Sequence, residues 1–197
     1  MNPTLLDRLF WQSGSDKGFG GHLYGEFYES KLKDLRNKPL KVLEIGLSNK
    51  PARNDGSISD TPSLWVWAVW FRNAQIIGAD IRPFKAPMDR MKTYTLDQGK
   101  GADIMNLVEA EGPFDIVIDD GSHLSSDILT SLKNLMDHTN LYYFIEDLHI
   151  TGNLDVIAYL DFIFGDCAES WWSACERGRF VACIEVERWK KQHTSTS

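Results

Sequence analysis

The chain has 197 residues with a formal net charge of −7, and 43% of its residues are hydrophobic and 25% are charged. This length suits a single domain with a sizeable core, and the composition is that of an ordinary globular protein. The acidic balance and the lack of a basic run argue against a nucleic-acid partner, and no apolar run of about 18 residues predicts a membrane span.

The three cysteines, Cys167, Cys175 and Cys183, follow no zinc-binding spacing. Their odd number, together with the lack of a signal peptide pattern at the N-terminus, predicts free thiols in a reducing compartment. We therefore expect a cytoplasmic protein.

The N-terminal residues predict two short helices joined by a glycine-rich loop. Apolar residues gather on one side of residues 1–10, and a second helical pattern covers 27–35. The loop at 14–24 does not match a P-loop, because Lys17 precedes its glycines and no Gly-Lys-Ser/Thr follows. It is either a flexible surface loop or a lid over a bound cofactor or substrate, and the sequence leaves both open.

Residues 40–46 are the first predicted strand, and Glu44 and Gly46 lie at its end. A glycine there lets the backbone pass close to a ligand, and the acid can accept a hydrogen bond from a ligand amine or hydroxyl. The usual GxGxxG dinucleotide fingerprint does not follow. A polar loop at 48–61, expected to be exposed, leads into a helix over 62–71. The tryptophans of that helix suit a core more often than a stacking platform.

Two more predicted strands end in polar residues. Residues 74–81 form the second strand, and its terminal Asp80 is placed to bind ribose hydroxyls, although it could instead cap the next helix. Because the first strand also ends in an acid and a glycine, we favour the ribose role. The third strand, at 91–98, ends in Asp97 and Gln98.

The remaining chain alternates between helical and strand patterns, with Trp171 and Trp172 near a turn or a helix end. The predicted elements are helices at 102–111, 125–137 and 155–164 and strands at 115–120, 142–147 and 179–188. Uninterrupted apolar runs suit parallel strands that are covered on both faces. The pattern predicts an α/β fold with a doubly wound, mostly parallel sheet. We expect one domain over 1–190, with an N-terminal lid segment at 1–38 and a frayed tail at 191–197.

Two of these strands end in acidic pairs. Asp119 and Asp120 end one strand, with His123 close behind, and Glu146 and Asp147 end the next. Open α/β sheets bind ligands at the carboxyl ends of their strands, so we expect these four carboxylates to converge. Like charges in one dry pocket raise each other's pKa or recruit a cation, and a hard divalent ion such as Mg²⁺ prefers carboxylate oxygens. Each pair could instead form a turn and cap a helix.

Several segments of the sequence together resemble one enzyme family. They are Ser15-Asp16-Lys17-Gly18 with His22 and Tyr24, Leu43-Glu44-Ile45-Gly46, Ser63-Leu64-x-x-Trp67, Gly78-x-Asp80-Ile81, Asp97-Gln98, Ile118-Asp119-Asp120-Gly121-Ser122-His123 and Ile145-Glu146-Asp147. The set resembles the class I S-adenosylmethionine-dependent methyltransferases, and among them the metal-dependent sugar O-methyltransferases of macrolide antibiotic biosynthesis, of the mycinamicin 2″-O-methyltransferase type. The chain is similar, more loosely, to the cephalosporin hydroxylases.

The resemblance implies a Rossmann-like methyltransferase fold and a role for individual residues. Asp120, Glu146 and Asp147 would bind Mg²⁺, and His123 would be the general base. The residues implied in binding S-adenosylmethionine are Glu44, Gly46, Ser63, Asp80, Ile81, Asp97, Gln98 and Asp119.

The implied activity is methyl transfer from S-adenosylmethionine to a hydroxyl of a sugar or a glycosylated small molecule. The alternatives are an oxidative enzyme on the same fold, whose iron would usually need more histidine, and a non-catalytic protein that binds S-adenosylmethionine. The chain departs from the family pattern at Leu96, where glycine is usual, and we expect no extra N-terminal domain like that of the macrolide enzymes. The tryptophan-rich segments suit a homo-oligomer interface as readily as a core.

Overall fold

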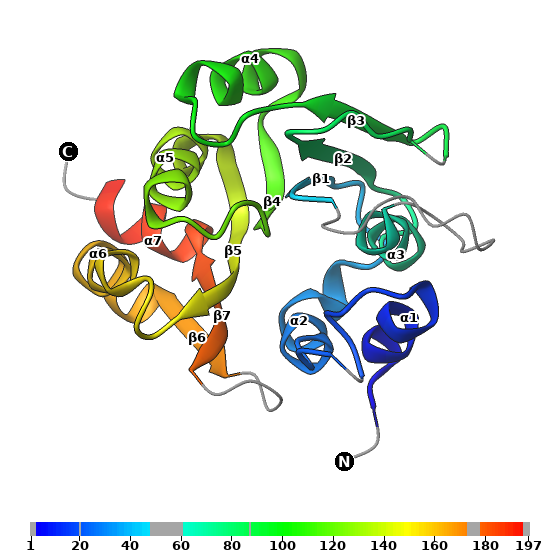
Figure 1. Ribbon diagram of the computed structural model, residues 1–197, viewed down its shortest axis with the longest axis horizontal. Helices are drawn as coiled ribbons and strands as arrows, with labels where there is room; N and C mark the ends of the chain where they lie inside the picture. The colour runs from blue at the N-terminus through cyan, green and yellow to red at the C-terminus, as the bar shows by residue number, and fades with distance from the viewer. Residues whose placement is uncertain (1–2, 20, 48–60, 87, 173–177, 195–197) are drawn as a thin grey trace.

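The computed structural model describes residues 3–19, 21–47, 61–86, 88–172 and 178–194. In this part of the chain a seven-stranded sheet has the order β3-β2-β1-β4-β5-β7-β6 (Figure 1). The strands are β1 (Lys41–Ile45), β2 (Gln75–Asp80), β3 (Met91–Thr95), β4 (Phe114–Asp119), β5 (Thr139–His149), β6 (Ala168–Trp172) and β7 (Arg179–Glu185). Strands β1 to β5 pair in parallel, and β7 pairs antiparallel with β5 and β6. The predicted doubly wound, mostly parallel α/β fold is therefore confirmed.

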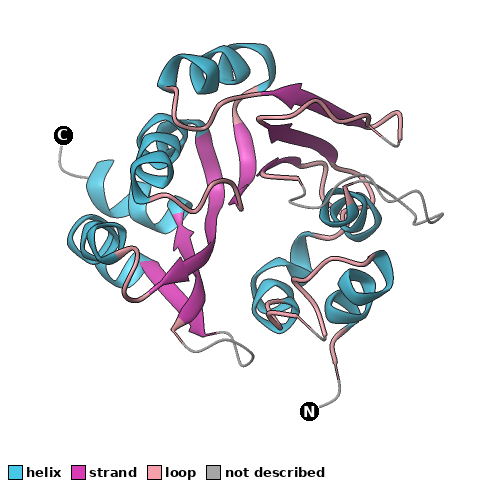
Figure 2. Ribbon diagram, viewed as in Figure 1, coloured by secondary structure: helices cyan, strands magenta, loops and turns pink. Residues whose placement is uncertain are grey.

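Helices cover both faces of the sheet (Figures 1 and 2). They are α1 (Leu5–Ser13), α2 (Gly25–Leu32), α3 (Pro62–Trp70), α4 (Gly101–Glu111), α5 (Ser125–Leu135), α6 (Leu154–Phe164) and α7 (Val186–Thr194), with short 3₁₀ turns η1 (Lys33–Leu35), η2 (Met136–His138) and η3 (Gly165–Cys167). Side chains of α1 to α3 share one core with the sheet, and those of α4 to α7 share the other. None of the helices in the described part of the chain has the length and apolar character of a membrane span.

The strands supply both cores because successive side chains point to opposite faces. In β4, Val117 lies in the core under α4 to α7, whereas its neighbours Ile116 and Ile118 lie in the core under α1 to α3. In β5, Tyr143 and Phe144 divide in the same way. All five side chains are fully buried. This explains why the apolar runs have no polar alternation.

The first two helices are part of a core layer. Phe10 of α1 and Tyr28 of α2 both pack edge-on against Trp67 of α3, with ring centroids 5.1 and 5.0 Å apart. Trp67 and Trp70 are buried, so the core interpretation of these tryptophans is confirmed. The loop that joins α1 to α2 leaves this layer and reaches the carboxyl end of the sheet.

The C-terminal elements differ from the sequence prediction. The strand expected to run to residue 188 ends at Glu185, and α7 continues through Thr194 into the expected tail; residues 195–197 lie outside the described part. Trp189 of α7 packs on Phe164, which anchors the helix. Trp171 and Trp172, expected near a turn or a helix end, are the last two residues of strand β6, where the Trp172 ring packs on Phe180 of the neighbouring strand. Most of the polar loop predicted at 48–61 also lies outside the described residues.

Candidate active site

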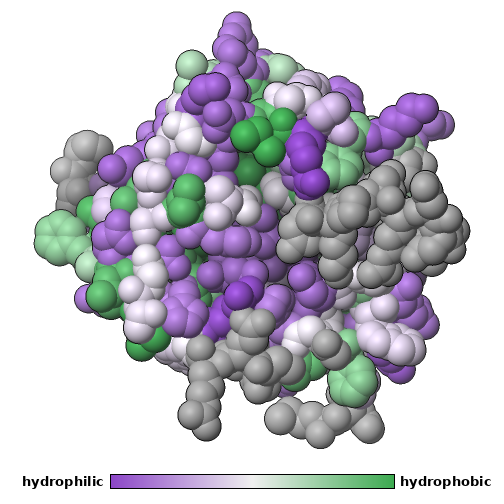
Figure 3. Space-filling view, in the orientation of Figure 1, coloured by the Kyte–Doolittle hydropathy of each residue, from purple (hydrophilic) through white to green (hydrophobic). Residues whose placement is uncertain are grey.

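A pocket of about 380 Å³ opens at the carboxyl ends of the parallel strands. This is the position at which open α/β sheets bind ligands. Hydrophilic residues cover the centre of this face of the molecule (Figure 3). The predicted site residues that line the pocket are Gly46, Ser63, Asp80, Ile81, Asp97, Gln98, Asp120, His123 and Asp147. The pocket therefore brings together the ends of β1 to β5, as the sequence predicts.

Three predicted site residues do not line the pocket. Glu44, Asp119 and Glu146 have exposed fractions of 0%, 1% and 1% and lie beneath its wall. Asp120 and Asp147 line the pocket. Glu146 lies behind it and shares Lys17 with Asp120, whereas Asp119 is held by Gln98 and Ser131.

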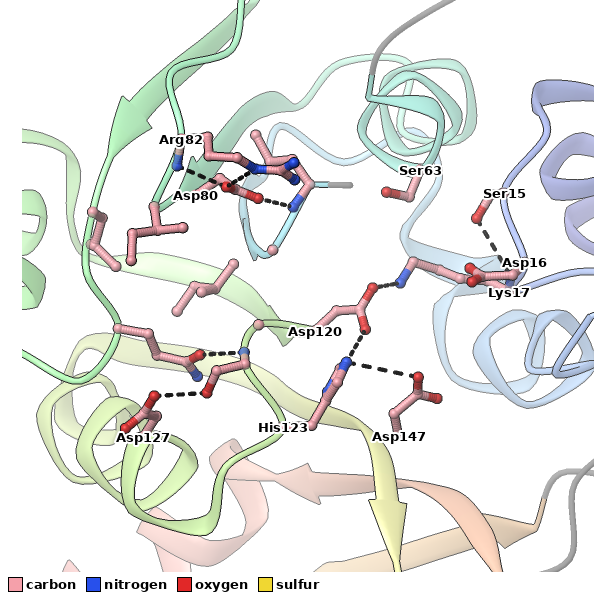
Figure 4. A pocket seen from close by; sticks show the side chains of 18 of the residues that line it. Ser15, Asp16, Lys17, Ser63, Asp80, Arg82, Asp120, His123, Asp127 and Asp147 are labelled. Atoms are coloured by element: carbon pink, nitrogen blue, oxygen red, sulfur yellow. Dashed lines mark hydrogen bonds and ion pairs between the residues drawn. The ribbon is translucent and has the colours of Figure 1, made fainter. Parts of the chain in front are cut away.

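Asp120, His123 and Asp147 form the centre of the site (Figure 4). The Nε2 atom of His123 is 3.9 Å from Oδ1 of Asp120 and 3.8 Å from Oδ2 of Asp147. One ligand atom from each residue lies within 4.8 Å of the other two, so these side chains could hold a metal ion. Two carboxylates and one imidazole are a donor set that a divalent cation accepts.

The backbone that carries this cluster is unusual. His123 and Asp147 have φ angles of 58° and 56°, in the left-handed region that side chains other than glycine seldom adopt. The pairing of β5 with β7 also shifts register between Ile145 and Leu148, which turns Asp147 toward the pocket. Gly46, with φ 84°, lies against the backbone of Asp120, where a Cβ would collide with the Asp120 carbonyl. Strained backbone of this kind is typical of functional sites.

Lys17 is the site residue to which the sequence pattern gave no role. It is 1% exposed, and its Nζ donates hydrogen bonds to Oδ2 of Asp120 and, over 2.8 Å, to Oε2 of Glu146. It also lies 3.7 Å from Oε1 of Glu44. Burial alone would lower the pKa of Lys17, but the three carboxylates together raise it well above its ordinary value, so the lysine is charged. The family pattern in the sequence includes Asp16-Lys17-Gly18 but predicts no contact between Lys17 and these carboxylates.

Two further side chains hold Asp147. The Tyr24 hydroxyl donates to Oδ1 over 3.0 Å, and the guanidinium of Arg179 in β7 donates to Oδ2 over 2.7 Å. His22 Nε2 lies 3.8 Å from the same Oδ2. The loop of residues 14–24 thus contacts both pocket carboxylates, Asp120 through Lys17 and Asp147 through Tyr24.

Glu146 is enclosed between α2 and the loop. The Tyr28 hydroxyl donates to its Oε1, and Lys17 holds its Oε2. Burial raises the pKa of Glu146, and the charge of Lys17 opposes this shift. Both carboxylate oxygens of Glu146 therefore have a hydrogen-bond partner within the protein.

At the opposite wall, polar side chains fix the loops that follow β1 and β2. Asp80 accepts hydrogen bonds from the backbone amides of Leu47 and Arg82, each over 2.9 Å. These bonds hold the end of β1 against the end of β2. Asp97 is paired with Lys100 over 3.0 Å, and this pair lowers its pKa.

Gln98 and Asp119 form a buried link beneath the loop that carries His123. The Gln98 amide donates to Asp119 and its Oε1 accepts from the backbone amide of Ser122 over 2.9 Å. Ser131 and Tyr143 also donate hydroxyl hydrogen bonds to Asp119. Burial raises the pKa of Asp119 to about 6, and the hydrogen bonds partly oppose this shift. Asp119 therefore supports the pocket wall from below.

No family model matches the chain, but curated relatives do. It is 36% identical over 148 residues to the 8-demethyl-8-alpha-L-rhamnosyl tetracenomycin-C 2′-O-methyltransferase of Streptomyces olivaceus, covering 73% of the chain and 37% of the relative. It is 34% identical over 131 residues to the mycinamicin VI 2″-O-methyltransferase of Micromonospora griseorubida, covering 64% of the chain and 32% of the relative. The chain is a homologue of sugar O-methyltransferases. It spans about a third of the length of these two relatives.

Solved structures agree with this homology. A crystal structure of the MycE methyltransferase from the mycinamycin biosynthetic pathway, in complex with Mg and SAH, matches 93% of this chain and 55% of MycE with a TM-score of 0.73 and 28% identity. A second MycE structure, with Mg, SAH and mycinamycin VI, matches with a TM-score of 0.72. The resemblance to the metal-dependent sugar O-methyltransferases and the class I methyltransferase fold are thereby confirmed.

Proposed function

We propose that the protein transfers a methyl group from S-adenosylmethionine to a hydroxyl of a sugar or a glycosylated small molecule, with Mg²⁺ bound in the same pocket. The observation that carries this proposal is the position of His123 beside the carboxylates of Asp120 and Asp147, in a pocket that Gly46 and Asp80 also line. The homologues are named as sugar O-methyltransferases, and the MycE structures contain Mg and SAH.

The wall formed by the ends of β1 to β3 is the proposed site for S-adenosylmethionine. Gly46 follows β1, and Ser63 lies in the first turn of α3. Asp80 ends β2, and Ile81 follows it. Asp80 still has lone pairs for ribose hydroxyls after its two backbone hydrogen bonds. Asp97 and Gln98, which follow β3, are proposed for the adenine end of the pocket. Glu44 and Asp119 complete the proposed set from beneath the wall.

The metal proposal fits the charges of the cluster. The carboxylates of Glu44, Asp120, Glu146 and Asp147 surround the site, and among the described residues Lys17 and Arg179 make ion pairs with them. When all four carboxylates are counted as ionised, two negative charges remain, which one divalent ion neutralises. Asp120 and Asp147 are the proposed ligands in the pocket, and Glu146 is the third carboxylate of the same cluster. When bound, such an ion orients two substrate oxygens and lowers the pKa of the reacting hydroxyl.

His123 is the proposed general base. The acceptor oxygen forms a bond to the methyl carbon as the carbon–sulfur bond of the sulfonium breaks, and the electron pair of that bond leaves with the neutral thioether. The acceptor proton passes to His123 Nε2. The imidazole is 39% exposed, so it can return the proton to water. The main contribution of the pocket to catalysis is to hold the acceptor hydroxyl in line with the methyl group.

The cluster does not favour the oxidative alternative. It contains one histidine and two carboxylates, the reverse of the ratio in the two-histidine, one-carboxylate sites of non-haem iron oxygenases.

A cytoplasmic location and a homo-oligomer remain predictions from the sequence. Light scattering on the purified protein tests whether it forms a homo-oligomer.

Calorimetric titration tests the proposal directly. We expect S-adenosylmethionine to bind the purified protein, and Mg²⁺ to bind wild-type protein but not the Asp120→Asn variant. Purified rhamnosides and other glycosides are then incubated with S-adenosylmethionine, and methylated products are detected by mass spectrometry. A protein that binds no S-adenosylmethionine with or without Mg²⁺ overturns the proposal.

A further inference from the structure

Lys17 enters the carboxylate cluster from the side opposite His123 (Figure 4). Its side chain is buried, and its backbone carbonyl accepts a hydrogen bond from the Tyr24 amide over 2.8 Å, which closes the loop at its base. A buried ammonium group is costly unless it is fully paired, and here it meets Asp120, Glu146 and Glu44.

We propose that Lys17 is a built-in counter-cation that fixes the orientation of Asp120 and sets the charge that a divalent ion meets in the pocket. This inference rests on the proposed function, because it concerns the same metal site. Lys17 lines the inner end of the pocket and acts through Asp120, so it is a positioning residue.

The two oxygens of Asp120 have different partners. Lys17 holds Oδ2, whereas Oδ1 is directed toward His123, 3.9 Å away. A charge-assisted hydrogen bond to one oxygen of a carboxylate restricts rotation about its last torsion angle, which otherwise has a broad distribution. Because Lys17 occupies Oδ2, the other oxygen, Oδ1, is the one that faces His123 and the proposed metal ion.

The same contact sets the net charge of the cluster to the value that one divalent ion neutralises. With Lys17 in place, one divalent cation neutralises the cluster, as described above. Without Lys17, three formal negative charges would face the ion, and Glu146 would lose the partner of its Oε2. The cluster should then attract Mg²⁺ more strongly while holding Asp120 less precisely. Loss of a lysine that only stabilised the fold would not strengthen Mg²⁺ binding.

The test substitutes Lys17→Met, which keeps the length of the side chain and removes its charge. Mg²⁺ is titrated by calorimetry at saturating S-adenosylmethionine, and kcat is measured at saturating Mg²⁺ with a glycoside that the wild type methylates. We expect the Mg²⁺ Kd to fall about tenfold, as the loss of one nearby positive charge predicts, and kcat to fall at least about tenfold. The same Kd or a weaker one, or an unchanged kcat, overturns the inference.

Lys31→Met is the matched control. Lys31 is also a partly buried lysine with two carboxylate partners, Glu169 at 2.6 Å and Glu185 at 3.0 Å, but it lies outside the pocket. Its loss should lower the melting temperature without changing the Mg²⁺ Kd or kcat. A change in Mg²⁺ Kd equal to that of Lys17→Met would show that the effect is general and would overturn the inference.

A charge-balanced variant covers the case in which Lys17→Met does not fold. Glu44 is buried, lies beside Lys17 and does not line the pocket, so Lys17→Met/Glu44→Gln removes one charge of each sign. We expect this variant to fold and to bind Mg²⁺ within about threefold of the wild type, since its charge is restored to the wild-type value. A tenfold difference in either direction overturns the inference. If the wild type binds no Mg²⁺ at all, the metal part of the proposed function fails together with the inference, whereas an insensitive Lys17 leaves that function standing.

Discussion

Asn153 holds the backbone of His123. Its Nδ2 donates a hydrogen bond to the His123 carbonyl over 3.1 Å, and its Oδ1 accepts one from the His149 amide over 2.9 Å. Asn153 is 4% exposed, so both bonds are shielded from water. One side chain thus ties the loop after β4, which carries the proposed base, to the end of β5, just beyond Asp147.

Replacing Asn153 with alanine should therefore loosen both strained segments at once. Loss of these two hydrogen bonds and of a third, from Nδ2 to the Ser125 hydroxyl, predicts a destabilisation of about 1–3 kcal/mol. We expect kcat to fall about tenfold, because His123 and Asp147 no longer keep their spacing, while the Kd for S-adenosylmethionine changes little. Steady-state kinetics, urea unfolding and calorimetry measure the three quantities.

Asn134→Ala is the control for this change. The Asn134 side chain donates to the Thr130 carbonyl within α5 over 2.8 Å, away from the pocket. It should alter stability alone. Equal loss of kcat in both variants would contradict a specific role for Asn153.

His123→Ala separates chemistry from binding. His123 lines the pocket and its Nε2 lies 3.8 Å from Oδ2 of Asp147, so loss of the proposed base should lower kcat by about 10²–10⁴. Binding of S-adenosylmethionine should stay within about threefold of wild type, because that cofactor is proposed to contact the opposite wall. His138→Ala, at the other end of β5, should leave kcat unchanged. Full activity of His123→Ala would remove this residue as the base.

Much of the fold follows from local sequence. Long apolar runs specify buried parallel strands, and an acid directly after such a run must lie at the carboxyl edge of the sheet. The ends of β1, β2 and β4 could be placed on this basis alone, which is why Asp80 and Asp120 were found in the pocket.

The remaining features depend on tertiary contacts. Lys17 and Asp120 are 103 residues apart, and no periodicity links them. The direction in which Glu146 points depends on the register shift in β5 and on the Tyr28 hydroxyl across the core. The end of β7 was missed because Val186 continues an alternating apolar pattern and only the packing of Trp189 reveals the helix.

Gly46→Ala should damage the site through the backbone. The positive φ of Gly46 disfavours any side chain, and the added Cβ would overlap the Asp120 carbonyl. We expect loss of Mg²⁺ binding and a destabilisation above about 2 kcal/mol, because strain and collision add. Gly165→Ala is the control, since Gly165 also has a positive φ but an added Cβ meets no atom within 4 Å. Gly165→Ala should lose stability through backbone strain alone and keep Mg²⁺ binding. Similar Mg²⁺ affinity in both variants would contradict this account of Gly46.

The stability of the metal-free protein should depend on pH through Glu44. Burial raises the pKa of Glu44 to about 7, and Lys17 opposes this shift only in part. Because the folded-state pKa lies above the unfolded one, the stabilising contribution is complete below about pH 4.5 and is lost as pH rises through about 7, by up to about 3 kcal/mol. Glu44→Gln should thus match the wild type near pH 4.5 and be more stable at pH 8. Urea unfolding in EDTA, without S-adenosylmethionine, at several pH values measures the difference between the two proteins. A difference that stays constant from pH 4.5 to 8 would show that Glu44 does not change its protonation on folding.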